Sequence, residues 1–307
     1  MIRTDLAMEA TEAYGQQQIP GVNVINEVIQ GIRKTKVIVS TPEGEQALGK
    51  KMGTYVTLET KELAHGDVTI DENCSKALAE EIKAMAGDAL NGVTLVVGLG
   101  NHMVTPDSLG PVVCDMVFVT RHIHEYVPES VDERMGNVCA ISPGVLGVTG
   151  IETGEIIKGV VDHIKPSLVI AIDSLASRSI DRVRTTVQLG DSGIAPGAGI
   201  GNKRKALDRE TLGIPVLALG VPLVVYASTV ANDLLEAAMA KTPEDARIQA
   251  KIRDLLKGMM DVEGADMIVT PKEIDKVVED LARIISDALN LALHRNLTLE
   301  ETRRYMH

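Results

Sequence analysis

One stretch of the chain, residues 93–111, constrains the fold more than any other. It begins with a short, β-branched apolar run bounded by glycines, which predicts a buried strand that leads into a glycine-rich loop. Thr105, Pro106 and Asp107 follow, in the pattern of an N-cap, a first helical residue and a first-turn carboxylate that the helix dipole favours. The strand therefore carries Asp107 to its C-terminal end, where open α/β sheets place their chemistry.

A second apolar run, residues 168–172, ends at Asp173. A run with no polar alternation is typical of a strand that is covered on both faces. Burial opposes the ionisation of Asp173, whereas a helix N-terminus favours that of Asp107, and two carboxyls in such different environments can form an acid–base pair. Neighbouring parallel strands would bring the two together. The alternative is that each Asp only caps a helix, Asp173 capping one that begins at Ser174.

The order of the remaining segments predicts a mixed α/β fold with a largely buried sheet and helices on both faces. We interpret residues 1–307 as a single α/β domain with an N-terminal arm at about 1–30 and a helical C-terminal region at about 229–307. Further strands are expected at 37–39, 55–58, 138–141, 183–189, 216–219 and 223–225, and helices at 71–86, 106–120 and 152–164.

Composition excludes several classes of function. The net charge of -12 and the absence of Trp argue against a nucleic-acid binder, which needs clustered cations and stacking aromatics. No window has the apolar length of a membrane span, and the N-terminus lacks the apolar core of a signal peptide. Three cysteines without CxxC spacing suit a reducing compartment. We therefore expect a soluble, cytoplasmic protein with no membrane partner and no direct nucleic-acid partner.

Other motifs give weaker signals. The glycines at 98 and 100 lack the third glycine of a dinucleotide-binding loop, and no serine lies in a GxSxG elbow. His122 and His124 could point the same way on a strand, but no third ligand has metal-site spacing, so no metal is expected. Lys203, Arg204 and Lys205 form a basic cluster in a long loop; they are either solvated or placed to meet acidic groups of a substrate.

Several ordered motifs, spread over nearly the whole chain, resemble the spore germination proteases of endospore-forming Firmicutes. The resemblance implies an endopeptidase that degrades small acid-soluble spore proteins in the spore core during germination. It also implies a zymogen, a homotetramer, no cofactor, and a fold similar to hydrogenase maturation proteases (phosphorylase/hydrolase-like). The family's catalytic carboxylates correspond here to Asp107 and Asp173. The motifs read VGLGNHMVTPDSLGP, PGVLGVTGIETGEII, AIDSLASRSIDRV, QLGDSGIAPGAGIGNKRK, LGIPVLALGVP and MIVTPKEID.

The resemblance also implies cleavage after acidic residues, whose side chain either the 203–205 cluster or Arg3 could bind, and self-removal of a propeptide between Asp5 and Leu6. The chain departs from the family pattern at Leu223 and Tyr226, where the family typically has Thr and Asp. An aspartate pair that shares a proton and activates a water is the first interpretation. A metal-dependent maturation-type protease on the same fold, or a non-catalytic binding protein, stays open at this point.

Overall fold

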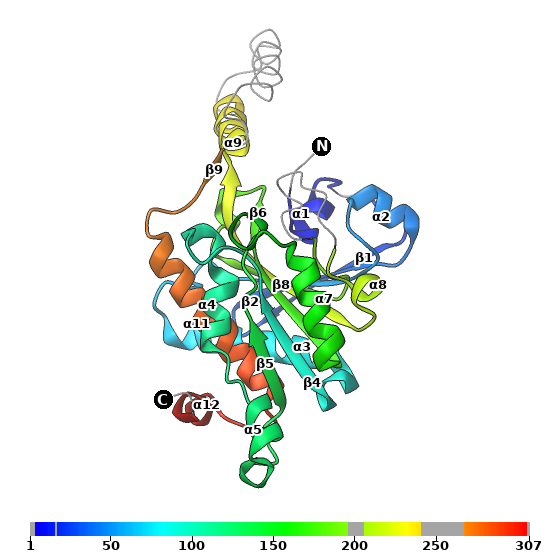
Figure 1. Cartoon of the computed structure of the whole chain (residues 1–307). Helices are drawn as coiled ribbons and strands as arrows, with labels where there is room; N and C mark the ends of the chain where they lie inside the picture. Colours follow the sequence, from blue (N-terminus) through cyan, green and yellow to red (C-terminus); the bar gives the residue numbers. More distant parts are fainter. Residues whose placement is uncertain (1–3, 16, 196–205, 241–266, 306–307) are drawn as a thin grey trace.

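A computed structural model describes residues 4–15, 17–195, 206–240 and 267–305. Its strands form one sheet in the order β1-β2-β3-β7-β8-β6-β4-β5, with β9 added to β8 (Figure 1). The pairs β8–β6, β6–β4 and β4–β5 are parallel, whereas the pairs that join β1, β2, β3, β7 and β8, and the pair β8–β9, are antiparallel. The bounds are β1 (Val22–Ile29), β2 (Ile32–Val39), β3 (Gly53–Glu59), β4 (Val93–Gly98), β5 (Asn137–Ile141), β6 (Leu168–Ser177), β7 (Thr186–Gly190), β8 (Val216–Tyr226) and β9 (Ile268–Val269).

Helices cover both faces of this sheet, as the sequence predicts. One face carries α3, α4 and α11, and the opposite face carries α7 and α8. The helices are α1 (Ala7–Glu12), α2 (Pro42–Leu48), α3 (Val68–Ala86), α4 (Leu109–Met116), α5 (Arg121–Tyr126), α6 (Leu146–Thr149), α7 (Thr153–Ile164), α8 (Arg209–Leu212), α9 (Ala227–Ala240), α11 (Ile274–Leu293) and α12 (Leu299–Tyr305). Short 3₁₀ turns span η1 (Gly87–Asn91), η2 (Thr105–Asp107), η3 (Pro128–Ser130) and η4 (Ile180–Arg182). No helix in the described ranges is long and apolar enough to cross a membrane.

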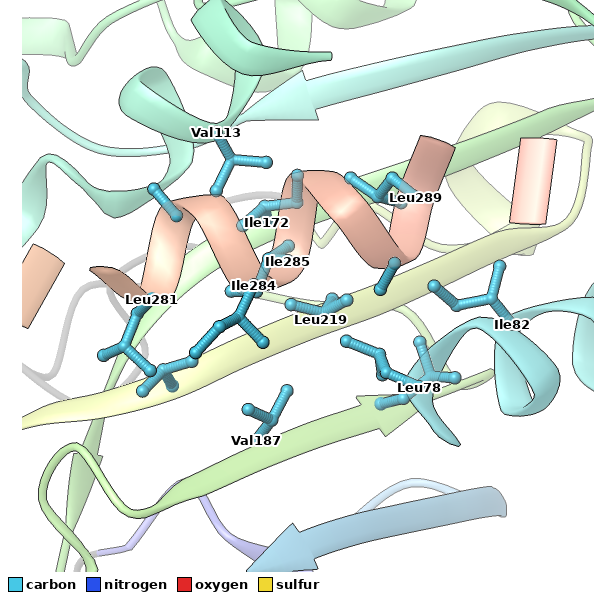
Figure 2. Close-up of a cluster of buried hydrophobic side chains, with 14 of the residues drawn as sticks. Leu78, Ile82, Val113, Ile172, Val187, Leu219, Leu281, Ile284, Ile285 and Leu289 are labelled. Atoms are coloured by element: carbon cyan, nitrogen blue, oxygen red, sulfur yellow. The ribbon is translucent and has the colours of Figure 1, made fainter. Parts of the chain in front are cut away.

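The larger core lies under α11. Leu281, Ile285 and Leu289 of this helix project toward strands β6 and β8 and toward α3 (Figure 2). All three are completely buried, and full burial of a side chain of this size stabilises a fold by roughly 1.5–3 kcal/mol. The C-terminal helix α11 therefore fixes the positions of the central strands that carry the site.

The central strands extend further than their apolar runs indicate. β6 continues past Asp173 to Ser177, so Asp173 lies within a strand and the helix cap at Ser174 is wrong. β8 is one strand, although Pro222 falls inside it. The register with β6 shifts between Leu175 and Ala176, and such an irregularity tolerates a proline that cannot donate to the ladder. The two strands predicted at 216–219 and 223–225 are therefore continuous.

The N-terminal segment is not a free arm. Leu6, Ala7 and Met8 are almost entirely buried, and residues 22–29 form the edge strand β1. The burial comes from packing on distant strands: Leu6 and Met8 contact Leu175 of β6, and Ala7 joins the cluster beneath β2 and β3. A segment this short has no periodicity of its own to reveal such packing.

Two other local predictions differ from the structure. The single helix expected at 106–120 is a 3₁₀ turn followed by α4, and the chain then turns into α5. His122 and His124 therefore lie on a helix and not on a strand. The α-helix α4 begins at Leu109 and not at Pro106, because the 3₁₀ turn at 105–107 ends at Ser108 before the α-helical hydrogen bonds begin.

Candidate active site

Asp107 and Asp173 line the same cavity, which has a volume of about 490 Å³. It lies at the C-terminal end of β4 and along the part of β6 that extends beyond β4. This is the edge at which a switch in strand order places ligands in open α/β sheets. Other residues that line it are Asp5, Gly49, Lys50, Lys51, Tyr55, Pro106, Ser174, Leu175, Ala176, Gln188, Ala195, Ala206, Gly220, Tyr226 and Ile268.

The backbone of the glycine loop fixes Asp107. The Asn101 N–H donates to the Asp107 backbone oxygen at 3.0 Å and to its Oδ2 at 2.8 Å. Gly100 has a φ of 110°, and a Cβ there would lie 2.0 Å from the Asp107 oxygen, so only glycine fits. The glycine loop therefore folds back against the 3₁₀ turn and holds the Asp107 carboxylate at the cavity.

Asp173 is held by its own strand. It is 8% exposed and pairs with Gly220 of β8, whose missing side chain leaves room for Leu175. Its Oδ1 accepts the Ser174 N–H at 2.9 Å. The Ser174 Oγ is buried and has no hydrogen-bond partner among the described residues, and it belongs to a residue of the cavity wall. A bound molecule can satisfy that hydroxyl.

Two glycines bring the elements of the two carboxylates together. A Cβ on Gly98 would lie 2.3 Å from the Gly110 oxygen, and one on Gly110 would lie 2.4 Å from the Leu99 oxygen and 2.6 Å from the Ile172 oxygen. The backbone of α4 thus rests directly on β4 and β6. This contact sets the spacing between the turn of Asp107 and the strand of Asp173.

The chain's own N-terminus runs along the open edge of β6. The Asp5 N–H donates to the Ala176 oxygen at 3.0 Å, and the Ala176 N–H donates to the Asp5 Oδ2 at 2.8 Å. Gln188 holds the other side: its Oε1 accepts the Ala7 N–H and its Nε2 donates to the Asp5 oxygen. Asp5 and Leu6 therefore lie beside the cavity, where Asp5 is hydrogen-bonded to the strand that carries Asp173.

Three ionisable groups that line the same cavity, Lys50, Lys51 and Tyr55, were missed by the sequence reasoning. Burial lowers the pKa of Lys50, although Asp5 and Glu9 oppose that shift, and Lys50 Nζ donates to the Thr4 oxygen at 2.9 Å. The hydrogen bond to Asp208 raises the pKa of Lys51. Burial raises the pKa of Tyr55 to about 12, so its phenol is neutral. Only Gly49, an αL helix cap just before the lysines, marks this turn in the sequence.

The other candidate residues fall into three groups. Lys203, Arg204 and Lys205 lie outside the described residues, but Ala195 and Ala206 on either side of that segment line the cavity. Leu223 and Tyr226 are buried, and Tyr226 reaches the cavity. Within the described ranges, no three His, Cys, Asp or Glu side chains gather in a way that could hold a metal ion.

The chain is similar to known proteins along its whole length. The family model described as germination protease matches residues 3–250 and 241–306. The germination protease of Caldanaerobacter subterraneus subsp. tengcongensis is 44% identical, covering 100% of this chain and 98% of that protein. Those of Clostridium acetobutylicum and Bacillus subtilis are 42% and 38% identical, covering 99% and 100% of this chain and 99% and 97% of those proteins.

Among solved structures, the [NiFe] hydrogenase maturation protease HycI from Thermococcus kodakarensis shows a distant likeness. It has a TM-score of 0.35 and 15% sequence identity, and the match covers 68% of this chain and 98% of that one.

These similarities place the chain in the class of proteases. The chain belongs to the germination protease family.

Proposed function

We propose that this chain is an aspartate-dependent endopeptidase that degrades small acid-soluble spore proteins during spore germination. The observation that carries the proposal is the shared cavity: Asp107 and Asp173 come from separate elements, on a fixed backbone, and line one space large enough for a peptide. Membership of the germination protease family supports the substrate class.

In the proposed mechanism the two carboxyls share one proton. The ionised carboxylate removes a proton from a water molecule as that water attacks the scissile carbonyl, and the protonated carboxyl hydrogen-bonds to the carbonyl oxygen. Collapse of the tetrahedral intermediate breaks the C–N bond, and a carboxyl proton passes to the leaving amine. The buried Ser174 hydroxyl lies beside Asp173 and can donate to the same peptide.

The paired N-terminus suggests how a substrate lies in the site. Beyond Ile172, β6 no longer pairs with β4, and Ala176 hydrogen-bonds to Asp5 along the edge that this leaves. A substrate in extended conformation would add to β6 in the same way and pass the two carboxylates. Removal of residues up to Asp5 by self-cleavage, so that the mature chain begins at Leu6, would open this edge and belongs to the same proposal, as does a zymogen form.

The finer parts of the proposal concern specificity, location and assembly. Lys203, Arg204 and Lys205 would receive an acidic substrate side chain by charge-assisted hydrogen bonds, and the adjoining Ala195 and Ala206 at the cavity wall support that role. Replacement of the three by Gln should weaken cleavage after Glu more than it weakens folding. The proposal also includes a homotetramer in the cytoplasm of the spore core and no cofactor.

The deciding experiment replaces each carboxylate with its amide. Asp107→Asn and Asp173→Asn should each abolish cleavage of a small acid-soluble spore protein, and the double variant should lose no more than either single one, because groups that act as a unit fail together. Asp162→Asn is the matched control, since that exposed residue only pairs with Lys158 on α7. Circular dichroism and thermal unfolding establish that each variant folds.

Each alternative function predicts a different result in the same cleavage assay. Near-normal cleavage by either Asn variant would reduce that Asp to a structural role. Inhibition by a chelator, reversed by an added metal, would support a metal-dependent maturation-type protease. If the wild-type chain, after removal of its N-terminal residues, cleaves no spore protein, the non-catalytic binding protein would be supported.

A further inference from the structure

The strand β1 at one end of the sheet is long, regular and uncovered. Residues 23–28 are all exposed, and Val24, Ile25 and Val28 are 40%, 46% and 72% exposed. No strand of the described part of the chain pairs with its outer edge (Figure 1). Proteins usually protect such an edge with proline, bulges, unpaired charge or a covering helix, because it can pair with another chain.

β1 has none of these protections. Its pairing with β2 is continuous from residue 22 to residue 29 without a bulge, and it contains no proline. Its one charged residue, Glu27, is neutralised within the sheet by Lys34 at 2.7 Å. The opposite end of the sheet differs: β5 has only five residues, and α5 packs against it.

The hairpin fixes which backbone groups of β1 point outward. Gln30 and Gly31 have φ of 51° and 85°, as in a two-residue type I′ turn, which makes Ile29 and Ile32 a hydrogen-bonded pair. Hydrogen bonding then alternates along the strand, so that odd-numbered residues bond to β2. The Ser40 N–H donates to the Gly21 oxygen at 2.8 Å, in agreement with that alternation. The even-numbered residues 24, 26 and 28 therefore present their N–H and C=O groups outward, whereas the Val22 N–H donates to the Ile19 oxygen at 3.1 Å.

This alternation selects a register for a second copy of the same strand. Two copies related by a two-fold axis at Asn26 place even residues opposite even residues, so the outward groups of residues 24, 26 and 28 all meet partners. In this register Val24 faces the partner's Val28 on the same side of the sheet, and Glu27 faces the partner's Ile25 and not a like charge. Overlaying the full strands, with Val22 opposite the partner's Ile29, pairs even with odd residues and leaves the outward groups mismatched.

We propose that β1 is a dimerisation strand, which pairs antiparallel with β1 of a second copy about a two-fold axis at Asn26 and makes one continuous sheet through both subunits. A two-fold interface uses the same surface on both subunits, and this strand is self-complementary in backbone pattern and in its apolar pair. No residue of β1 lines the cavity of Asp107 and Asp173, and the nearest strand that does, β3, lies two strands away, so the interface leaves the cavity open.

One test removes an outward donor without disturbing the hairpin. Val24→Pro deletes an N–H that points away from β2, so the hairpin keeps its ladder and the second copy loses a bond and meets the proline ring. Val24→Thr is the matched control, with nearly the same shape and the N–H retained. Sedimentation equilibrium should show the assembly mass of Val24→Pro at half that of the wild type and of Val24→Thr.

A second test does not depend on how the proline variant folds. A nitroxide on Asn26→Cys should lie beside its symmetry mate, since hydrogen-bonded antiparallel partners have Cα atoms about 5.5 Å apart. The same label on Asn23→Cys should lie about 20 Å from its mate, six residues along the strand. Strong dipolar broadening at position 26, weak broadening at 23, and loss of both on dilution with unlabelled protein would establish the register; labelled wild type corrects for the native cysteines.

Two results would overturn the proposal. A narrow spectrum at position 26 in the undiluted assembly would exclude strand pairing there, whatever the assembly mass. A chain whose label at position 26 is immobilised only after a spore protein is added would show that β1 receives substrate and not a second copy.

Discussion

Replacement of Gly110 by alanine tests whether direct backbone contact sets the spacing of the two carboxylates. A Cβ at Gly110 would lie 2.4 Å from the Leu99 oxygen, 2.6 Å from the Leu99 nitrogen and 2.6 Å from the Ile172 oxygen. All three are backbone atoms, so no side-chain rotation can relieve the overlap. The whole of α4 must move away from β4 and β6, and the turn that holds Asp107 moves with it.

The size of the effect follows from two opposing terms. Alanine within a helix is more favourable than glycine by about 1 kcal/mol. Forced overpacking of a closely packed contact costs about 1–3 kcal/mol or more, and here the resisting atoms are the least compliant ones. The matched control is Gly159→Ala in α7, where a Cβ meets nothing within 4 Å, so only the favourable term remains. Because the favourable term is common to both variants, the free energy of unfolding of Gly110→Ala should be about 1–3 kcal/mol lower than that of Gly159→Ala.

Urea denaturation followed by circular dichroism measures this difference as a shift of midpoint at constant slope. Cleavage by folded Gly110→Ala, measured well below its unfolding midpoint, should also fall, because displacement of a reacting group by about 1 Å can cost about 100-fold in rate. Gly159→Ala should cleave at the wild-type rate. Equal midpoints for the two variants, or full activity of Gly110→Ala, would refute the view that this contact positions Asp107.

Three further predictions concern ionisable groups. Glu9→Ala should destabilise the fold by about 3–5 kcal/mol, because the buried Glu9 carboxylate pairs with Arg182 and accepts two backbone N–H groups. Glu12→Ala, which removes an exposed partner of Arg182, should cost at most about 1 kcal/mol. Unfolding midpoints measure both losses of stability, and equal losses would contradict the prediction. Burial lowers the pKa of His294 from 6.5 to about 4, so the folded state resists protonation of this side chain; the neutral histidine contributes about 3 kcal/mol of stability above pH 6.5, and this contribution is lost as pH falls toward 4. His294→Asn should therefore be less stable than the wild type at pH 7.5, and its free energy of unfolding should fall less steeply on acidification. Parallel pH profiles of stability for the two proteins would contradict this prediction. Lys50→Met should lower cleavage after Glu about tenfold relative to cleavage after Gln, since a half-buried cation at the cavity wall favours an acidic side chain; an unchanged ratio of kcat/KM would assign that preference elsewhere.

The local chemistry of this protein could be predicted from the sequence. The apolar runs at 93–98 and 168–172 are buried parallel strands, because residues without polar alternation can be covered only on both faces. The glycine loop and the turn before α4 follow from the residues that permit them. The sequence also singled out Asp107 and Asp173, which line one cavity, and the motifs around them indicated the family to which the chain belongs.

Only the tertiary structure decided which distant groups meet. Asp173 looked like the end of a strand because its apolar run stops there, but pairing with β8 carries β6 on to Ser177. Lys50, Tyr55 and Gln188 reach the cavity from positions without a sequence signal, since burial of a polar residue depends on what the rest of the chain places around it. The position of Asp5 is decided in the same way: its segment has no regular pattern to follow, and the open edge of β6 supplies the hydrogen bonds that the segment itself cannot.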